Sequence, residues 1–157
     1  MVVYLIRHAH AGSRSAWDGP DRDRPLSAKG RSQSRWLADL LADRRVGRIL
    51  SSPAVRCTQT VEPLAGRLGL AVETSDDLRE GADPRLTLDR LGALADEDAA
   101  LCAHGDLIPE VVAALRADGM AIEGEPAAKK GSVWVLERQG GRFAEGRYVL
   151  PPALARR

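Results

Sequence analysis

Short, continuously apolar runs alternate along the chain with longer stretches in which apolar residues recur at helical spacing. A continuous run of this kind is typical of a strand that is covered on both faces of its sheet. Such runs lie at residues 2–6, 48–50, 71–74 and 99–103. The stretches that follow them predict helices over residues 27–44, 53–69, 84–95 and 107–118. Two further strand-like segments, 132–137 and 142–149, flank the turn sequence QGG and predict a hairpin.

Capping residues mark where several of these helices begin or end. Ser27 is a good N-cap for the first helix, since its hydroxyl can accept a hydrogen bond from a free backbone N–H. Pro53 is expected in the first turn of the second helix, where its missing N–H is not needed, and Gly69 near that helix's end. Pro109 fits the first turn of the fourth helix for the same reason.

The order of these elements predicts the fold class. Strands that alternate with helices form an α/β domain, because each helix returns the chain to a parallel neighbouring strand. We therefore expect a three-layer α/β/α sandwich with a mainly parallel central sheet and a C-terminal hairpin. No repeat or linker divides the chain, so we expect one domain over residues 1–150 and a C-terminal tail over residues 151–157.

The composition excludes several classes of protein. With 44% hydrophobic and 29% charged residues, the chain should bury a core rather than remain disordered. A net charge of +1 argues against nucleic acid or an acidic membrane as the partner. The apolar start before Arg7 is too short for a signal-peptide core or a membrane span. Cys57 and Cys102 lack metal-type spacing, which fits a reducing compartment, so we expect a cytoplasmic protein.

Polar and mostly basic residues follow three of the predicted strands. Arg7 and His8 come directly after strand 2–6, and His104 comes directly after strand 99–103. Arg56 follows strand 48–50 through the segment SSPAVR. In open α/β sheets ligands bind outside the carboxyl ends of the strands, so these cations would converge on one anion if the strands are neighbours. Two guanidinium groups suit a phosphoryl group, because each offers a bidentate fork.

A histidine in such a phosphate site can act as a nucleophile. His8 could attack phosphorus through an unprotonated ring nitrogen, and the charges of Arg7 and Arg56 should lower the pKa of its imidazole. The two arginines, together with His104, would stabilise the negative charge on the equatorial phosphoryl oxygens. The four residues therefore predict covalent phosphoryl transfer.

A departing alkoxide also needs a proton, and a carboxylic acid is the usual donor. The segment DDLREGADP, residues 76–84, offers Glu80 as the best general acid, with Asp77 and Asp83 behind it. The alternative is that Glu80 is simply a solvated acid in a polar loop.

These residues lie in segments that resemble the motifs of the histidine phosphatase superfamily, whose fold is phosphoglycerate mutase-like. RHAHAG resembles the family's RHG signature, and RPLSAKG resembles its PLTxxG segment. SSPAVRCTQT is similar to the SSPxxRAxQT segment and AHGDLIP to the segment of the second histidine. The short SixA type is indicated. RCTQTVEPLA and KGSVWVL are similar to the phosphatase-like domain of two-domain MutT-type Nudix hydrolases, although this chain has no Nudix box.

The resemblance implies a role for each residue. His8 is implied as the phosphorylated nucleophile, and Arg7, Arg56 and His104 as the groups that bind the phosphoryl oxygens. It implies neither a cofactor nor a metal. Ala9 departs from the family, which usually has glycine there, and a methyl group is tolerable if φ is negative.

Other polar and aromatic residues near these motifs leave alternatives open. His10 fits a position at the rim of the site or a structural role. Trp17 could face the substrate or anchor its own loop, and Ser52 and Thr58 are expected to cap a helix rather than touch phosphate.

Two functions other than phosphatase activity are alternatives. His8, His10 and His104 could form a three-histidine zinc site, but the adjacent arginines would repel the cation. The chain could also be a non-catalytic phosphate-binding module, which a hydrolysis assay would decide.

The substrate is less well determined by the sequence. About ten residues separate the third strand from the third helix, too few for a lid over a small sugar phosphate. An open pocket suits a phosphoryl group displayed on a phosphoprotein or on one end of a phosphorylated small molecule. We expect a SixA-like phosphohistidine protein phosphatase, with a phosphatase of nucleoside di- or polyphosphates as the alternative.

Overall fold

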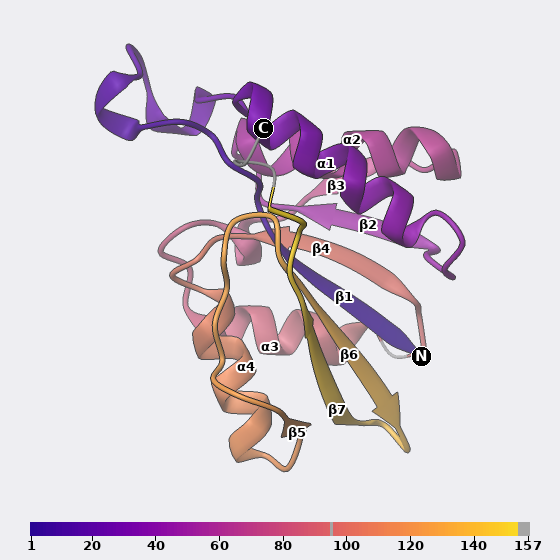
Figure 1. The fold of residues 1–157 in the computed structure, drawn as a ribbon. Helices are drawn as coiled ribbons and strands as arrows, with labels where there is room; N and C mark the ends of the chain where they lie inside the picture. Colours follow the sequence, from indigo (N-terminus) through magenta and orange to yellow (C-terminus); the bar gives the residue numbers. More distant parts are fainter. Residues whose placement is uncertain (95, 154–157) are drawn as a thin grey trace.

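A mixed sheet of seven strands forms the centre of the computed structural model, which describes residues 1–94 and 96–153 (Figure 1). The strand order is β3-β2-β4-β1-β6-β7-β5. The strands are β1 (Val2–Arg7), β2 (Arg48–Ser51), β3 (Val72–Thr74), β4 (Ala99–Ala103), β5 (Ala121–Ile122), β6 (Val133–Gln139) and β7 (Arg142–Val149).

The first four strands run parallel, and their register sets the position of the residues that follow them. β4 lies between β2 and β1, with Ser51 opposite Cys102 and Arg7 opposite Ala103. The carboxyl ends of these three strands therefore reach the same edge of the sheet. β6 pairs antiparallel with β1 and β7 antiparallel with β6, which confirms the C-terminal hairpin.

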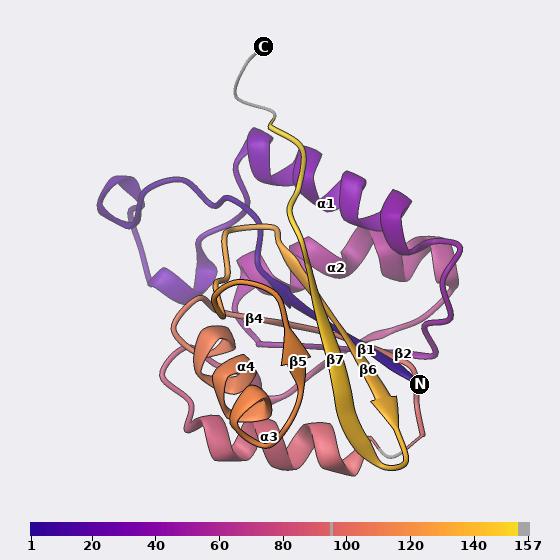
Figure 2. The same ribbon diagram turned by 60° about the horizontal axis from the view of Figure 1, so that its bottom comes forward.

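Two helices cover each face of the sheet, so the predicted three-layer α/β/α sandwich is confirmed (Figures 1 and 2). The helices are α1 (Ala28–Leu41), α2 (Val55–Leu68), α3 (Pro84–Ala93) and α4 (Ile108–Ala117). Leu37 and Val61 of α1 and α2 pack in the core on one face. Leu91 and Val111 of α3 and α4 pack in the core on the other. Side chains alternate along each strand, so β1 contributes to both cores.

The second helix begins later than the sequence predicts. Pro53 lies outside α2, which starts at Val55, because the backbone N–H of Ser52 still donates to Cys102 O (2.9 Å) beyond the end of β2. This hydrogen bond keeps the chain extended. Gly69 ends the helix with a φ of 67°, as its position indicated.

The first and third helices are shorter than predicted. Beyond Leu41, the last buried residue of α1, the chain turns, and Arg44 N donates to Leu41 O (3.0 Å). α3 ends at Ala93, and residue 95 lies outside the described residues. Ser27 and Pro109 occupy the helix starts that the sequence predicted.

Several short elements carry no sequence pattern and were not predicted. β5 has two residues and pairs parallel with β7. The described residues also contain three single-turn 3-10 helices, at Arg14–Ala16, Asp21–Asp23 and Asp76–Leu78. Two of them lie in the long connection from β1 to α1, and the third lies in residues 75–83, a connection as short as the sequence indicated.

The chain end was expected to form a separate tail over residues 151–157. Residues 151–153 follow β7 without regular secondary structure, whereas residues 154–157 lie outside the described part of the chain. Within the ranges that the structure describes, no helix is both long and apolar enough to cross a membrane.

Candidate active site

The strand register brings the four residues that sequence analysis singled out to one edge of the sheet. The rings of His8 and His104 lie edge to face, with their centroids 5.4 Å apart. The guanidinium of Arg7 passes directly against Gly105, where an added Cβ would lie 2.5 Å from Arg7 Cζ. Glycine is therefore needed beside Arg7, because any side chain there would displace the guanidinium.

His8 is held in one protonation pattern by the backbone. Its Nδ1 lies 2.8 Å from Ala9 O, and a carbonyl can only accept a hydrogen bond, so Nδ1 carries the proton. The neutral ring then has its lone pair on Nε2. Burial above all, together with the charges of His104 and the two arginines, lowers the pKa of His8 to about 3. The direction agrees with the sequence argument, but burial is the larger cause.

Arg56 is almost fully buried, with 2% of its surface exposed. Its Nη1 donates to Asp21 O (2.8 Å), and its Nη2 lies 3.1 Å from the Asp21 carboxylate. Arg7 is anchored differently, through a hydrogen bond from Nη1 to Ala128 O (2.7 Å). Each guanidinium is thus held at one end.

Three buried nitrogens of these residues have no hydrogen-bond partner among the described residues. They are Arg7 Nε, Arg56 Nε and His104 Nδ1. A buried polar group without a partner is costly, and such groups concentrate where a ligand supplies the missing partner. Since the three side chains are those that the sequence assigned to a phosphoryl group, an anion fits this set of donors.

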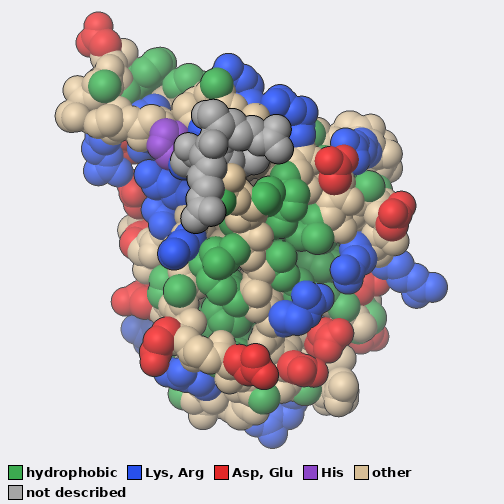
Figure 3. All heavy atoms as spheres, in the orientation of Figure 1, with side chains coloured by type: hydrophobic (Ala, Val, Ile, Leu, Met, Phe, Trp, Pro, Cys, Tyr) green, Lys and Arg blue, Asp and Glu red, His purple; other side chains and the backbone are tan. Residues whose placement is uncertain are grey.

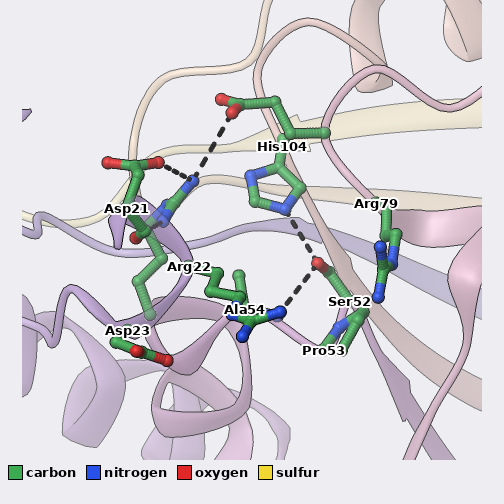
Figure 4. Close-up of a pocket in the computed structure, with 10 residues that line it drawn as sticks. Asp21, Arg22, Asp23, Ser52, Pro53, Ala54, Arg79 and His104 are labelled. Carbon is green, nitrogen blue, oxygen red and sulfur yellow. Dashed lines mark hydrogen bonds and ion pairs between the residues drawn. The ribbon is translucent and has the colours of Figure 1, made fainter. Parts of the chain in front are cut away.

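His104 is oriented by Ser52, which sequence reasoning expected only to cap a helix. Ser52 Oγ lies 2.8 Å from His104 Nε2, and Figure 4 shows the two side chains meeting in the pocket. Ser52 Oγ also accepts from Ala54 N (3.3 Å), before the helix begins. Thr58 Oγ1 donates to Val55 O (3.1 Å) within α2, so it neither caps the helix nor reaches the site.

The free thiol of Cys57 is a further neighbour of His104 that the sequence did not single out for the site. Its Sγ lies 3.5 Å from His104 Nε2. Cys57 is fully buried, as is Cys102, and neither forms a disulfide.

A pocket of about 520 Å³ opens beside these groups. Arg56, His104 and Ser52 line it, and so does Glu80, the predicted general acid. The Glu80 carboxylate lies 3.8 Å from Arg56 Nη2 and 3.1 Å from Arg14 Nη2. It is therefore within reach of a group bound at Arg56, although it is ion-paired on its outer side.

The two other carboxylates of the Glu80 segment have structural roles. Asp77 is ion-paired with Arg90 (2.9 Å), and Asp83 caps α3 by accepting from Arg85 N (2.9 Å). Neither lines the pocket.

Asp21 is a residue of the site that the sequence analysis missed. Its carboxylate lies within 3.2 Å of Arg14, Arg24 and Arg56, on the side of the pocket labelled in Figure 4. Burial raises the pKa of Asp21, but the hydrogen bond to Arg24 and the nearby arginine charges outweigh it, and the pKa is lowered overall. Only the alternation of acids and bases in DRDRP could have indicated it, and that pattern is common in surface loops.

Two residues with open roles lie away from the pocket. His10 Nδ1 lies 2.6 Å from Ser27 Oγ, at the start of α1, so His10 has a structural contact. Trp17 Nε1 donates to Pro20 O (2.9 Å) and anchors its own loop. In the described ranges no group of three or more His, Cys, Asp or Glu side chains could hold a metal ion, so the three histidines do not form a ligand set.

The methyl group of Ala9 is accommodated in a small cluster. Ala9 is fully buried and packs with Ala11 and Leu26. Its backbone N–H donates to Thr60 Oγ1 (3.0 Å), and Thr60 in turn donates to Arg56 O (2.6 Å). The segment that carries His8 is thus tied to the helix that carries Arg56.

A comparison with known families gives a match that includes the first three motifs. The model of the histidine phosphatase superfamily (branch 1) matches residues 3–83. This segment contains Arg7, His8, Arg56 and Glu80, whereas His104 lies beyond it.

A curated relative and two solved structures are similar over almost the whole chain. The 8-oxo-(d)GTP phosphatase of Mycolicibacterium smegmatis is 32% identical over 96% of this chain, which spans 48% of that relative's length. The protein histidine phosphatase SixA complexed with tungstate is 25% identical, with a TM-score of 0.77 over 96% of this chain and 95% of that one. The SixA protein of Agrobacterium tumefaciens is 28% identical, with a TM-score of 0.72 over 96% of this chain and 98% of that one.

Proposed function

The chain belongs to the histidine phosphatase superfamily, and from this premise we propose that it is a phosphatase that works without a metal, through a phosphohistidine on His8. One observation carries the proposal. The three buried nitrogens without partners belong to Arg7, Arg56 and His104, the side chains that surround the imidazole of His8. A phosphoryl group bound there would satisfy these nitrogens and face Nε2.

In the first step the lone pair of His8 Nε2 forms a bond to phosphorus. The bond from phosphorus to the leaving atom breaks, and that atom, an ester oxygen or the ring nitrogen of a phosphohistidine substrate, takes its electron pair and a proton from the Glu80 carboxylic acid. The guanidinium groups and His104 stabilise the charge on the transferred oxygens. The low pKa of His8 supports this role, because it keeps the nucleophile neutral at ordinary pH.

In the second step water attacks the phosphohistidine. Glu80, now a carboxylate, accepts a proton from that water, and the P–N bond breaks with its electron pair returning to Nε2. Orthophosphate leaves, and both His8 and Glu80 recover their starting protonation states.

A phosphohistidine protein is the first substrate class that we propose. The short connection over residues 75–83 leaves the pocket without a lid, so a phosphoryl group on a bulky partner could reach it. The likeness to two SixA-type structures at 25% and 28% identity supports the same class.

Nucleoside di- or polyphosphates are the second class. The similarity of 96% of this chain to part of an 8-oxo-(d)GTP phosphatase favours them. A phosphohistidine protein, nucleoside diphosphates and sugar phosphates, tested side by side with the purified protein, would rank the classes.

Hydrolysis of p-nitrophenyl phosphate tests the mechanism itself. Activity should persist in EDTA, His8→Ala should abolish it, and Arg7→Ala or Arg56→Ala should lower kcat by roughly 10² or more. Arg85→Ala is the matched control, since that side chain is 87% exposed and should not affect the rate. Near-normal activity of His8→Ala would refute the nucleophile. Phosphate binding by the wild-type protein without any hydrolysis would instead support a non-catalytic module.

A further inference from the structure

A second pocket lies at the same edge of the sheet, beyond Arg7. Its volume is about 540 Å³, and Arg7, His10 and Lys29 line it together with Lys129 and Lys130. The wall therefore combines the end of β1, the start of α1, the segment that precedes β6 and residues 150–153, which follow β7. We call this the lysine pocket.

The charge of the lysine pocket has one sign. The chain contains three lysines, and all three line this pocket, whereas every other basic side chain that counts toward its net charge is arginine. Among the described residues no aspartate or glutamate lines the pocket, and no ion pair joins any of the three lysines to a carboxylate. In Figure 3 blue side chains gather beside the histidine at the upper left.

The positive charges in the lysine pocket lower one another's pKa values. Burial and the nearby positive charges, that of Arg7 first, lower the pKa of Lys130. Burial and the charges of Lys130 and Lys29 lower the pKa of His10 in the same way. Like charges without a counter-charge destabilise the folded state, and a bound anion would relieve the repulsion.

The backbone that carries two of the lysines is fixed against the active site. Gly131 N donates to the carbonyls of Arg7 (3.2 Å) and His8 (3.1 Å). Lys129 N donates to Tyr148 Oη (2.7 Å), and its carbonyl accepts from Ser132 N (2.9 Å). The lysines therefore start from a preorganised segment, so less conformational entropy is lost when they bind a ligand.

Arg7 connects the two pockets. It lines the lysine pocket, and its unpartnered Nε belongs to the donors that surround His8. A group bound in the lysine pocket would thus share Arg7 with the reacting phosphoryl group.

We propose that the lysine pocket binds the non-reacting phosphates of a substrate that carries two or more linked phosphoryl groups, the terminal one of which reacts at His8. The inference rests on the proposed function: it assigns a binding pocket to the second substrate class proposed there and extends that class to phosphoanhydrides in general. Lysine suits this task, since its ammonium is a compact charge that binds phosphate without the fixed geometry of a guanidinium. Transfer of the terminal phosphoryl group to His8 breaks the anhydride P–O bond. The rest of the phosphate chain is the leaving group and takes the electron pair of that bond.

Binding to the His8→Ala protein tests the inference without turnover. Calorimetry should show that inorganic tripolyphosphate binds about tenfold more tightly than orthophosphate, since each tenfold step corresponds to about 1.4 kcal/mol. In the His8→Ala background, Lys29→Gln with Lys130→Gln should abolish this preference and change orthophosphate binding less than about twofold. Lys29→Arg with Lys130→Arg retains both charges, so this variant should keep most of the preference for tripolyphosphate over orthophosphate. An unchanged preference in the double Gln variant would overturn the proposal, as would equal binding of both anions before substitution.

Turnover of the otherwise wild-type protein separates this inference from the proposed function. The double variant Lys29→Gln with Lys130→Gln should raise KM for ADP and for tripolyphosphate about tenfold. Its KM for p-nitrophenyl phosphate should stay unchanged. Equal losses for the two anhydrides identify the linked phosphates as the ligand, and a loss for ADP alone identifies a nucleoside diphosphate. An equal loss for p-nitrophenyl phosphate, or a loss confined to a phosphohistidine protein, would overturn the inference. If the protein with all lysines intact hydrolyses nothing, the proposed function fails while the binding measurement still decides the lysine pocket.

Discussion

At the scale of single residues, Asp21 forms an ion pair with the guanidinium of Arg56, which we assign to binding the phosphoryl group. Its carboxylate lies 3.1 Å from Arg56 Nη2, and its backbone carbonyl accepts from Nη1 of the same side chain. A phosphoryl dianion bound at Arg56 would share that guanidinium with the carboxylate. We therefore expect Asp21 to weaken anion binding through like-charge repulsion.

Asp21→Asn should tighten the inhibition by orthophosphate by about threefold to tenfold at low salt, because it removes one negative charge and keeps the shape of the side chain. The inhibition constant in the p-nitrophenyl phosphate assay measures this. Asp23→Asn is the matched control, since Asp23 lines the same pocket and makes no ion pair among the described residues. Weaker inhibition of Asp21→Asn would mean that the carboxylate serves to hold Arg56 in place.

Glu80→Gln should slow the hydrolysis of alkyl phosphates about 10²-fold and that of p-nitrophenyl phosphate much less, because a basic alkoxide needs a proton as it leaves. The fall in rate at high pH should disappear for the alkyl substrate. Rates for the two substrates over a pH series measure both effects.

Glu73→Gln is the control for this substitution. Glu73 is 47% exposed and paired with Arg48, as Glu80 is 48% exposed and paired with Arg14, but it lies on β3 away from the pocket. Equal slowing of both substrates by Glu80→Gln would indicate positioning or activation of water instead of acid catalysis.

At the scale of elements, the start of α1 fixes the loop that follows the nucleophile. Ser27 Oγ accepts from Gly30 N (3.1 Å), and Ser27 N donates to His10 O (3.0 Å). Gly30 packs so closely on this loop that an added Cβ would overlap His10 O. The close contact between the backbones of Gly30 and His10 thus explains why the RPLSAKG motif has a glycine at this position.

Gly30→Ala should destabilise the fold by roughly 2 kcal/mol or more, because the backbone of His10 must move although alanine favours a helix. Gly66→Ala is the matched change within α2, where an added Cβ meets nothing within 4 Å, and it should stabilise by about 0.5–1 kcal/mol. Urea denaturation of both variants measures the difference. A neutral effect of Gly30→Ala would show that the loop adapts freely.

At the scale of the whole molecule, burying a neutral His8 makes stability depend on pH. The folded pKa of about 3 lies below the ordinary value of 6.5, so the unfolded chain binds the extra proton between these values. Stability is therefore complete above pH 6.5 and is lost as the pH falls toward 3.

Between pH 7 and pH 5 this residue should lower the free energy of unfolding by about 2 kcal/mol. His8→Asn removes the titrating group. Between pH 7 and pH 5 the free energy of unfolding of this variant should therefore fall by about 2 kcal/mol less than that of the wild-type protein. Urea denaturation at both pH values gives the comparison, in which the other titrating groups are shared. Identical losses in the two proteins would contradict a buried neutral His8.

The sequence by itself determined the fold class, and it singled out four residues that the structure brings to one edge of the sheet. Apolar runs and helical spacing are local patterns, and they identified every strand of the described residues except the two-residue β5. Arg7 ends β1, His8 follows it and His104 follows β4, so their approximate position required only the rule that ligands bind at carboxyl ends. Boundaries such as Pro53 were missed where one long-range hydrogen bond kept the chain extended.

Only the tertiary structure decided which groups meet. The convergence of His8 and His104 depends on β4 lying between β1 and β2, and strand order is not encoded in any local pattern. The contact of Asp21 with Arg56 and the gathering of Lys29 with Lys129 and Lys130 join segments far apart in the chain. Such contacts depend on strand register and on how loops pack, which are properties of the whole folded molecule rather than of neighbouring residues.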